Sequence, residues 1–338
     1  MFKKSLTYQE SIKNVASTIS EKGGTVLVTG ASGLIGTCIV DALVSANLYF
    51  GKHFQIYAIG RNADKLFGKF GSNPDIHCVA HDISEPISIS GIDYIIHAAS
   101  NADPSSYALY PVETILTNVL GAKNVLDYCR NNNTRALLTS SFEVNGKLEQ
   151  DEYSENDYGI IDLNMIRSCY PESKRTAELL FRSYYDEYEV DCVIARLPSV
   201  YGPTMQSNDS KAQAQFLRNA ISGEDIVLKS KGTPKRTYCY VMDAISGLLT
   251  VLFTGKSGEI YNVANGNSIA TIAEVAQTIA DISGQKVIFD LPNEIEKKGF
   301  SKPQNCILKS EKVKALGWNG RYTLKKGMEE TIQILKEL

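Results

Sequence analysis

From residue 25 to about residue 200, short apolar runs alternate with longer stretches in which apolar residues recur at helical spacing. The first pair is the strand-like TVLVTG followed by the helical SGLIGTCIVDALVSA. The later strand-like runs are QIYAIG, HCVAHDI, DYIIHAAS and ALLTSS, and the helical PVETILTNVLGAKNVLDYCR precedes the last of them. Strands interleaved with helices require crossover connections and a parallel sheet covered on both faces. We therefore expect an α/β protein with a doubly wound parallel sheet.

The pattern changes at both ends of this region. Residues 1–24 carry Glu10 and Glu21 and lack a continuous apolar segment, which predicts an N-terminal extension with a short helix and not a signal or transit peptide. Beyond residue 200 the elements are shorter, and a last helix is predicted from about Leu324. We expect residues 25–200 to form the main domain. Residues 201–338 should form mainly a smaller substrate-binding lobe, with some segments returning to the first domain.

Composition narrows the class of protein. The 338 residues are 43% apolar, which is enough for a packed core, and 35 basic against 38 acidic residues leave a net charge of -3. Such a balance favours neither nucleic acid nor an anionic membrane, and no run approaches the roughly 18 apolar residues of a membrane span.

Seven scattered cysteines without a CxxC pair predict free thiols in the cytoplasm. His77, Cys78 and His81 cluster, but no second ligand pair follows at zinc spacing, so we expect no metal.

A glycine-rich turn links the first strand to the first crossover helix. The segment TGASGLIG places Gly30, Gly33 and Gly36 there, with Leu34 and Ile35 opening the helix. Glycines permit a tight turn and let the backbone approach a pyrophosphate, whose charge meets the free N–H groups of the helix. The turn could also be a plain glycine-rich connection. Its place in the first crossover favours a Rossmann-like domain that binds a dinucleotide with these five residues.

The ends of the next strands bear on the cofactor. A carboxylate after the second strand would bind the adenosine ribose, but this chain reads GRN there. Arg61 could bind the 2′-phosphate of NADP, stack on adenine or do neither, so we expect NAD with NADP as the alternative. Asp82, followed by Ile83, is a candidate for the adenine edge, although it could equally be an ordinary strand-exit residue. Ala98 and Ala99, near the end of DYIIHAAS, complete the expected cofactor contacts.

Tyr170 and Lys174 lie four residues apart on a predicted helix and so project from one face. About one such pair is expected by chance in a chain of this composition, so spacing alone proves little. A phenol with a pKa of about 10 is a poor base at neutral pH, and each unit of lowering requires roughly 1.4 kcal/mol. A neighbouring ammonium and a nicotinamide cation could supply several units in a shielded pocket.

The stretch LLTSSFEVNG ends a predicted strand with hydroxyls and a carboxylate. Ligands of this fold lie outside the carboxyl ends of the strands, so Ser141 and Glu143 would reach the edge near the tyrosine helix. Taken alone, both residues could be ordinary turn residues.

Together the glycines, the hydroxyl strand end and YPESK resemble the extended short-chain dehydrogenase/reductase family, over roughly residues 24–335. Within it, HDISEP, ASNADPSSYALYPVETILTNVLGAKNVL, SCYPESKRTAE, VYGP and RTYCYVMDAISGLL look most like UDP-glucuronate decarboxylases. The resemblance implies an NAD(P)-dependent enzyme that acts on a nucleotide sugar through a transient 4-keto intermediate.

The resemblance also implies roles for individual residues. Tyr170 would take the proton of the sugar 4-hydroxyl, Lys174 would lower the pKa of Tyr170 and hold the cofactor ribose, and Ser141 would share the hydrogen bond. Glu143 could remove the C5 proton. Among the expected substrate contacts, Tyr107 would touch the sugar, Arg236 the diphosphate and Ser199 the nucleotide. The resemblance further implies a homodimer, joined by the helices that begin near Pro111 and Tyr170.

The sequence departs from the decarboxylase pattern at several positions. Phe142 and Asn145 replace residues of TSEVYG, and Ser301–Pro303 stand where an arginine precedes a proline. Ser199 stands where many relatives have asparagine. A nucleotide-sugar 4-epimerase or 4,6-dehydratase is therefore an alternative, although Phe142 cannot protonate a leaving hydroxyl. From other classes, we also consider a non-catalytic dinucleotide-binding regulatory protein and an oxidoreductase that releases reduced cofactor.

Overall fold

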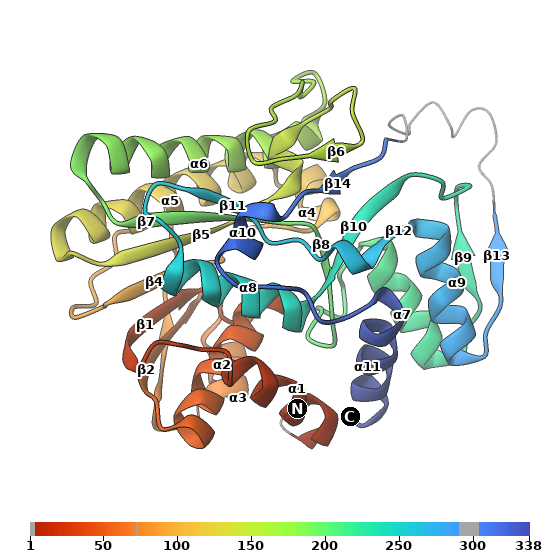
Figure 1. The fold of residues 1–338 in the computed structure, drawn as a ribbon, viewed down its shortest axis with the longest axis horizontal. Coiled ribbons are helices and arrows are strands. Elements are labelled where there is room, and N and C mark those ends of the chain that lie inside the picture. The colour runs from red at the N-terminus through yellow and green to blue at the C-terminus, as the bar shows by residue number, and fades with distance from the viewer. Residues whose placement is uncertain (1–3, 72, 291–303) are drawn as a thin grey trace.

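A seven-stranded parallel sheet forms the centre of the protein (Figure 1). The computed structural model describes residues 4–71, 73–290 and 304–338. The strand order is β11-β7-β5-β4-β1-β2-β3, and every neighbouring pair is parallel. The strands are β1 (Gly23–Thr29), β2 (His53–Gly60), β3 (Ile76–Ala80), β4 (Tyr94–His97), β5 (Arg135–Ser141), β7 (Cys192–Leu197) and β11 (Ile260–Asn262). The α/β fold class and the doubly wound parallel sheet expected from the sequence are confirmed.

Helices cover both faces of the sheet, which explains why its strands read as apolar runs. Figure 1 shows α5 and α6 on one face, and α2, α3 and α8 on the other. Successive residues of β1 point to opposite faces: Val26 and Val28 belong to one apolar cluster and Leu27 to the other. The bounds of these helices are α2 (Leu34–Phe50), α3 (Ala63–Phe70), α5 (Pro111–Asn132), α6 (Cys169–Tyr188) and α8 (Val241–Thr254).

The N-terminal segment contains the predicted helix, α1 (Leu6–Ala16), which packs against α2, α8 and α11 (Leu324–Lys336). The Ser5 hydroxyl donates to the carboxylate of Glu337 at 2.5 Å and so ties the beginning of α1 to the end of α11. The two ends of the chain consequently lie close together in Figure 1. The predicted last helix from Leu324 is confirmed.

Three small sheets lie beside the large sheet, and most of their strands come after residue 200. The strands of these small sheets are β8 (Ser199–Tyr201), β10 (Lys235–Tyr240) and β12 (Ile269–Thr271); β9 (Ile226–Leu228) and β13 (Val287–Phe289); and β6 (Glu152–Tyr153) and β14 (Ile307–Leu308). The remaining helices are α4 (Pro104–Leu109), α7 (Ala212–Ser222), α9 (Ile272–Ser283) and α10 (Glu311–Ala315), with short 3-10 turns at η2 (Phe142–Asn145), η3 (Ile166–Ser168) and η4 (Gly266–Ser268). By contrast, β11 and α8 join the large sheet, so the domain division at residue 200 stays a prediction.

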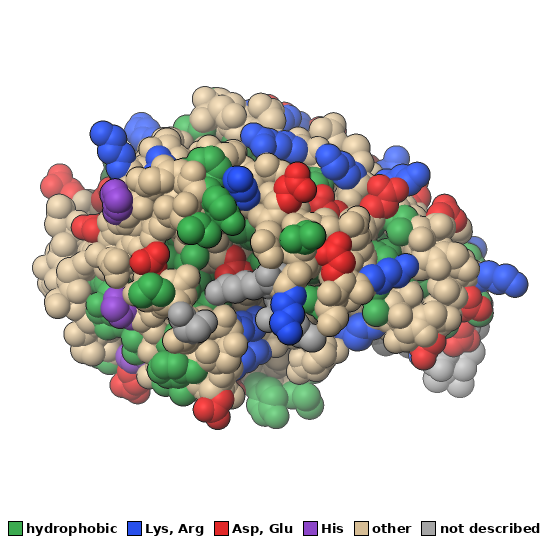
Figure 2. Space-filling view, turned by 90° about the horizontal axis from the view of Figure 1, so that it is seen from below, with side chains coloured by type: hydrophobic (Ala, Val, Ile, Leu, Met, Phe, Trp, Pro, Cys, Tyr) green, Lys and Arg blue, Asp and Glu red, His purple; other side chains and the backbone are tan. Residues whose placement is uncertain are grey.

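Two properties of the surface follow. No helix in the described part of the chain is both long enough and apolar enough to cross a membrane. On the face shown in Figure 2, acidic and basic side chains are interspersed and do not gather into a field of one sign.

Candidate active site

A cleft of about 1170 Å³ lies at the carboxyl ends of the central strands. Strand order reverses between β1 and β4, so the loops that follow these strands diverge and leave room for a ligand. The smaller lobe closes the other side of the cleft through β8, β10 and the segment before α7. The cleft lining includes most of the residues predicted from the sequence: Gly30, Gly33, Leu34, Ile35, Gly36, Ala98, Tyr107, Ser141, Glu143, Tyr170, Lys174, Ser199 and Arg236.

The glycine-rich turn brings backbone N–H groups to this cleft. Gly30 has a φ of 65°, and a Cβ there would lie 2.8 Å from the carbonyl oxygen of Ala98. A Cβ at Gly36 would lie 2.4 Å from the oxygen of Gly30, so the helix can approach the strand only without a side chain. Among the described residues, no side chain caps the N-terminus of α2 at Gly33. The first turn of α2 therefore presents free donors and a positive dipole end, which fit a diphosphate.

A buried threonine and histidine fix the strands beneath the turn. The Thr29 hydroxyl accepts the N–H groups of Ala98 at 3.1 Å and Ala99 at 3.0 Å. Its own proton is therefore free for Nδ1 of His97, 2.9 Å away. Burial, aided by the charge of Lys174, lowers the pKa of His97 to about 3. The ring is neutral, and sequence reasoning missed both residues because a threonine and a histidine at strand ends have ordinary structural roles.

The predicted catalytic residues come together at the end of β5 and the start of α6. Tyr170 is buried, and a hydrogen bond links its hydroxyl to Ser141. Burial raises the pKa of Tyr170, the charge of Glu143 raises it further, and the bond to Ser141 opposes the rise. The tyrosine is thus a neutral phenol here. Its ring stacks on Tyr107, with 4.6 Å between centroids and 14° between planes.

Lys174 lies one turn after Tyr170 and is almost completely buried. Its ammonium donates to the carbonyl oxygen of Thr139 at 3.0 Å. Burial lowers the pKa of Lys174 to about 8, and the negative charge of Glu178 opposes this change. The lysine is therefore held against β5, within the lining of the cleft.

An arginine that sequence reasoning missed pairs with the predicted acid. Glu143 lies in η2, and its carboxylate accepts a hydrogen bond from Arg167 Nη2 at 2.9 Å. Arg167 lines the cleft and is half exposed. Its place three residues before Tyr170, in RSCYPESK, is the signal that could have found it. The cleft thus carries a positive charge next to Glu143.

The two departures in SSFEVNG have different surroundings. Phe142 lines the cleft and packs against an apolar cluster with Tyr153 and Leu308. Asn145 is buried and donates to the carbonyl oxygen of Asp157 at 2.7 Å. Asn145 therefore holds the connection between β5 and α6, whereas Phe142 gives the cleft an apolar wall beside Glu143.

Four predicted cofactor residues do not line the cleft. Arg61 is largely exposed and pairs with Glu113 at 2.5 Å. Asp82 follows β3, Ile83 is buried in the core, and Ala99 bonds to the threonine described above. Their contacts with a cofactor stay predictions.

Two predicted substrate residues, Ser199 and Arg236, lie on paired strands. Ser199 opens β8 and Arg236 belongs to β10, and these strands pair in parallel. Arg236 is exposed within the cleft lining. The departure at Ser301–Pro303 lies outside the described residues. Within residues 4–71, 73–290 and 304–338, no cluster of three or more His, Cys, Asp and Glu residues could hold a metal ion.

Known proteins resemble this chain over most of its length. It is 32% identical over 316 residues to UDP-glucuronic acid decarboxylase 6 of Arabidopsis thaliana, covering 91% of this chain and 89% of the relative. It is 29% identical over 317 residues to UDP-glucuronic acid decarboxylase 1 of Danio rerio, covering 91% and 72%.

Solved structures share the fold. A UDP-glucose 4-epimerase from Thermotoga maritima superposes with a TM-score of 0.79 at 20% identity, covering 92% of this chain and 98% of the other. A dTDP-glucose 4,6-dehydratase from Bacillus anthracis, in complex with NAD, gives a TM-score of 0.76 at 22% identity, covering 92% and 96%. The model of one family matches residues 26–264, which is more than half of the chain. From this match and the 32% identical relative, we conclude that the chain belongs to the NAD dependent epimerase/dehydratase family.

Proposed function

We propose that this protein is an NAD(P)-dependent nucleotide-sugar-modifying enzyme, like the UDP-glucuronate decarboxylases, that works through a transient 4-keto intermediate. One observation carries the proposal: Ser141, Glu143, Tyr170 and Lys174 line one cleft with the glycine-rich turn. Relatives named UDP-glucuronic acid decarboxylase support it, since they match about nine-tenths of the chain.

The cleft fits a dinucleotide. The uncapped first turn of α2 would bind the diphosphate, and the close approach of Gly30 and Gly36 leaves no room for side chains there. Bound NAD+ would accept a hydride and supply a positive charge in the pocket. Arg61 already pairs with Glu113, which supports NAD over NADP because a 2′-phosphate would compete with that carboxylate.

In the proposed reaction the phenolate of Tyr170 would take the proton of the sugar 4-hydroxyl, and a bound nicotinamide would accept the hydride from C4. Ser141 holds that hydroxyl through its hydrogen bond, and the ammonium of Lys174 stabilises the phenolate. The 4-ketone then accepts the electron pair of the C5–C6 bond as the C6 carboxylate leaves as carbon dioxide. A proton would return to C5, the bound cofactor would give the hydride back to C4, and Tyr170 would return its proton to the 4-oxygen, so the cofactor would undergo no net oxidation or reduction.

The alternatives differ after the first step. A 4,6-dehydratase must protonate a leaving 6-hydroxyl, and Phe142 at the cleft wall offers no proton. A 4-epimerase would need only the oxidation at C4, a rotation of the keto sugar, and the return of the hydride and the proton to its other face. Glu143, beside Arg167, supports chemistry at C5 or C6 over simple epimerisation.

The test is to incubate the protein with UDP-, GDP- and dTDP-sugars, including UDP-glucuronate, and to read the products by NMR while following absorbance at 340 nm. We expect a UDP-pentose and carbon dioxide from UDP-glucuronate, without steady formation of reduced cofactor. Mass spectrometry of the cofactor released by acid would distinguish NAD from NADP. If no sugar turned over and no nucleotide bound, the enzyme assignment would be wrong.

We further infer a homodimer joined by α5 and α6, which pack against each other on one face of the sheet. A stripe of exposed apolar residues, Val112, Leu116 and Leu120, runs along α5, and the exposed Leu109 and Leu179 lie on α4 and α6. Side chains three or four positions apart lie on one side of a helix, so most of the stripe is a single surface.

All seven cysteines are free, which supports the expectation of a reducing compartment such as the cytoplasm.

A further inference from the structure

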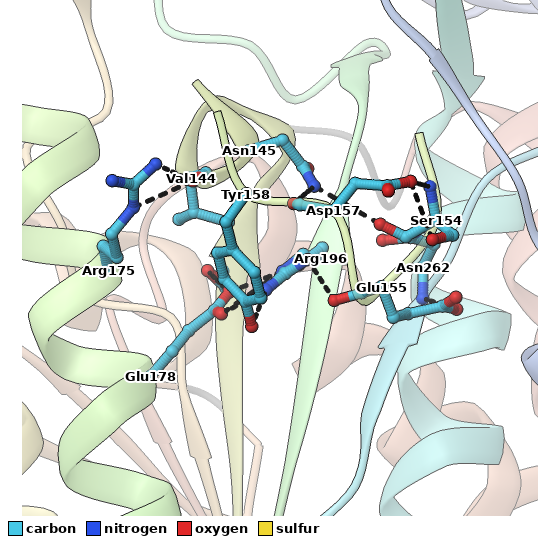
Figure 3. Close-up of polar contacts among 11 residues, drawn as sticks. Val144, Asn145, Ser154, Glu155, Asp157, Tyr158, Arg175, Glu178, Arg196 and Asn262 are labelled. Carbon is cyan, nitrogen blue, oxygen red and sulfur yellow. Dashed lines mark hydrogen bonds and ion pairs between the residues drawn. The ribbon is translucent and has the colours of Figure 1, made fainter. Parts of the chain in front are cut away.

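A buried ion pair between Arg196 and Glu178 joins β7 to α6 (Figure 3). Arg196, on β7, has no exposed side-chain surface, and Glu178, on α6, has 4%. Arg196 Nε and Nη2 donate to the two carboxylate oxygens of Glu178 at 2.9 and 2.7 Å. Such a bidentate pair is geometrically specific, and removing one partner leaves an uncompensated charge in the interior.

The pair is connected to the catalytic groups on one side. The carboxylate of Glu178 also accepts the hydroxyl of Ser140 at 2.5 Å, and Ser140 precedes Ser141 at the end of β5. Glu178 follows Lys174 by one helical turn, so both side chains project from the same face of α6. The negative charge of Glu178 opposes the lowering of the pKa of Lys174 that burial causes.

On the other side, Arg196 holds the connection between β5 and α6. Its Nη1 donates to the carbonyl oxygen of Glu155 at 2.9 Å and its Nη2 to the hydroxyl of Tyr158 at 2.9 Å. The carboxylate of Glu155 accepts the N–H of Asn262, on β11, at 2.8 Å. Figure 3 shows these side chains converging from α6, β7, β11 and the connection. The guanidinium of Arg196 therefore joins Glu178 on α6 to Glu155 and Tyr158 in the connection.

We propose that Glu178, held by Arg196, is a positioning residue of the active site: it fixes the end of β5 through its bond to Ser140 and holds a carboxylate one helical turn from Lys174. This inference rests on the proposed function, because it concerns the same catalytic groups. A purely structural ion pair would need neither the bond to Ser140 nor a place one turn from Lys174.

The expected pH effect has a definite sign. The titratable and charged groups around Lys174 are Tyr170 and Glu178 on its own helix, His97 at the end of β4 and Arg196 behind Glu178. His97 is neutral, and Arg196 is neutralised by Glu178. Removing the carboxylate lowers the pKa of Lys174 below its present value of about 8. The ammonium is then lost at a lower pH.

The experiment measures NADH binding by nicotinamide fluorescence between pH 6 and 9.5, for the wild type and for Glu178→Gln. Lys174 should bind the cofactor ribose through its ammonium, so affinity falls where the ammonium loses its proton. We expect this midpoint to move down by about one pH unit or more in Glu178→Gln. The matched control is Glu187→Gln, the same change at an exposed position of α6, and its midpoint should not move.

Further variants separate an effect on the active site from an effect on the stability of the fold. Glu178→Gln leaves Arg196 unpaired and could unfold, so the double variant Glu178→Gln with Arg196→Gln removes both charges together. Its midpoint should also move down. Ser140→Ala keeps the ion pair and should leave the midpoint in place while kcat falls several-fold and KM changes little. Unchanged midpoints in both Glu178 variants, with only a lower Tm, would overturn the positioning role.

The two proposals fail in different ways. If the wild type binds NADH but turns over no sugar, the proposed reaction is wrong and the binding profiles still decide the role of Glu178. If sugars turn over and the midpoint does not move, only the inference about Glu178 is wrong. If the wild type does not bind NADH at all, both are wrong.

Discussion

At the scale of single residues, the candidate base has surroundings that oppose its ionisation. Tyr170 is buried next to a carboxylate, and both conditions raise the pKa of its phenol. Lys174, which should favour the phenolate, has its own pKa lowered to about 8. Ionisation therefore needs further positive charge, and the nicotinamide of a bound cofactor would bring it. We expect that the tyrosine becomes basic only when the cofactor is present.

The first prediction concerns Tyr170→Phe. It should lower kcat by about 10²- to 10⁴-fold, because it removes the proton acceptor, and should change NADH affinity by less than about threefold. Steady-state rates on the accepted nucleotide sugar and a fluorescence titration measure the two effects. Tyr185→Phe, at an exposed position of the same helix, is the matched control and should keep full activity. A Tyr170→Phe protein with normal turnover would contradict the mechanism and favour a binding protein.

The second prediction separates two steps of the reaction. Glu143→Gln should still allow oxidation at C4 but slow the chemistry at C5 or C6, so reduced cofactor should accumulate in a single turnover. Stopped-flow absorbance at 340 nm measures this. Glu149→Gln, in the exposed connection after η2, should behave as the wild type. If Glu143→Gln and the wild type gave identical traces, Glu143 would be an ordinary turn residue.

The third prediction concerns the stability of the fold against pH. The pKa of His97 is lowered to about 3 by burial, whereas the free side chain titrates near 6.5. The unfolded chain therefore takes up a proton first, so stability is fully present above pH 6.5 and falls toward pH 3. The slope from this group should be roughly 1.4 kcal/mol per pH unit, measured by urea unfolding. His97→Gln should reduce the slope, and His77→Gln, at an exposed position, should not.

At the scale of elements, the junction of β1 and α2 depends on glycine. In Gly36→Ala the new methyl group would lie 2.4 Å from the oxygen of Gly30, so α2 must move away from the strand. We expect a loss of a few kcal/mol in the free energy of unfolding and a large loss of NADH affinity. Gly68→Ala, in α3, meets no atom within 4 Å and should stabilise the protein by about 0.5–1 kcal/mol. Thermal unfolding of both variants tests the pair, and equal Tm values would contradict the close approach.

The elements of the large sheet were predictable because the repeat of apolar and polar positions in each of them can be read from neighbouring residues. A run such as TVLVTG becomes β1, with both faces buried, and the helical period after Gly33 becomes α2. The small sheets were harder, since β8 and β12 are three residues long and pair with β10 across distant parts of the chain. A short strand has too few positions to establish a period.

The site was predictable from the sequence where the residue types and their local spacing indicate the chemistry. Tyr170 and Lys174 share a helix face, and the glycines surround a turn, so local spacing found them. Arg196 and Glu178 lie on different elements and pair only in the folded protein. Charged residues are mostly exposed, so their burial could not be expected from the sequence. Arg167 was missed for the same reason, because its partner comes from the end of another strand.

At the scale of the whole molecule, the exposed apolar residues on α5 and α6 are suited to packing against a second copy of the chain. The fifth prediction is that Leu116→Glu combined with Leu179→Glu converts a dimer to a monomer, because both side chains are exposed in the isolated chain and would face the second copy. Size-exclusion chromatography with light scattering measures the mass. Leu48→Glu, at an exposed apolar position of α2, is the control and should leave the mass unchanged. A wild type that is monomeric at all concentrations would contradict the interface.

The hydrogen bond between Ser5 and Glu337 makes the backbone almost a closed ring. A linker of a few residues could join α11 to α1, and the ring could be reopened at Gly91, a turn with open space around it between β3 and β4. Such a circular permutant should refold with its cleft intact, because side-chain packing holds the layers together whatever the order of the elements along the chain. New ends at Gly91 would lie just before the amino end of β4, and would therefore offer a point of attachment at the edge of the sheet opposite the cleft.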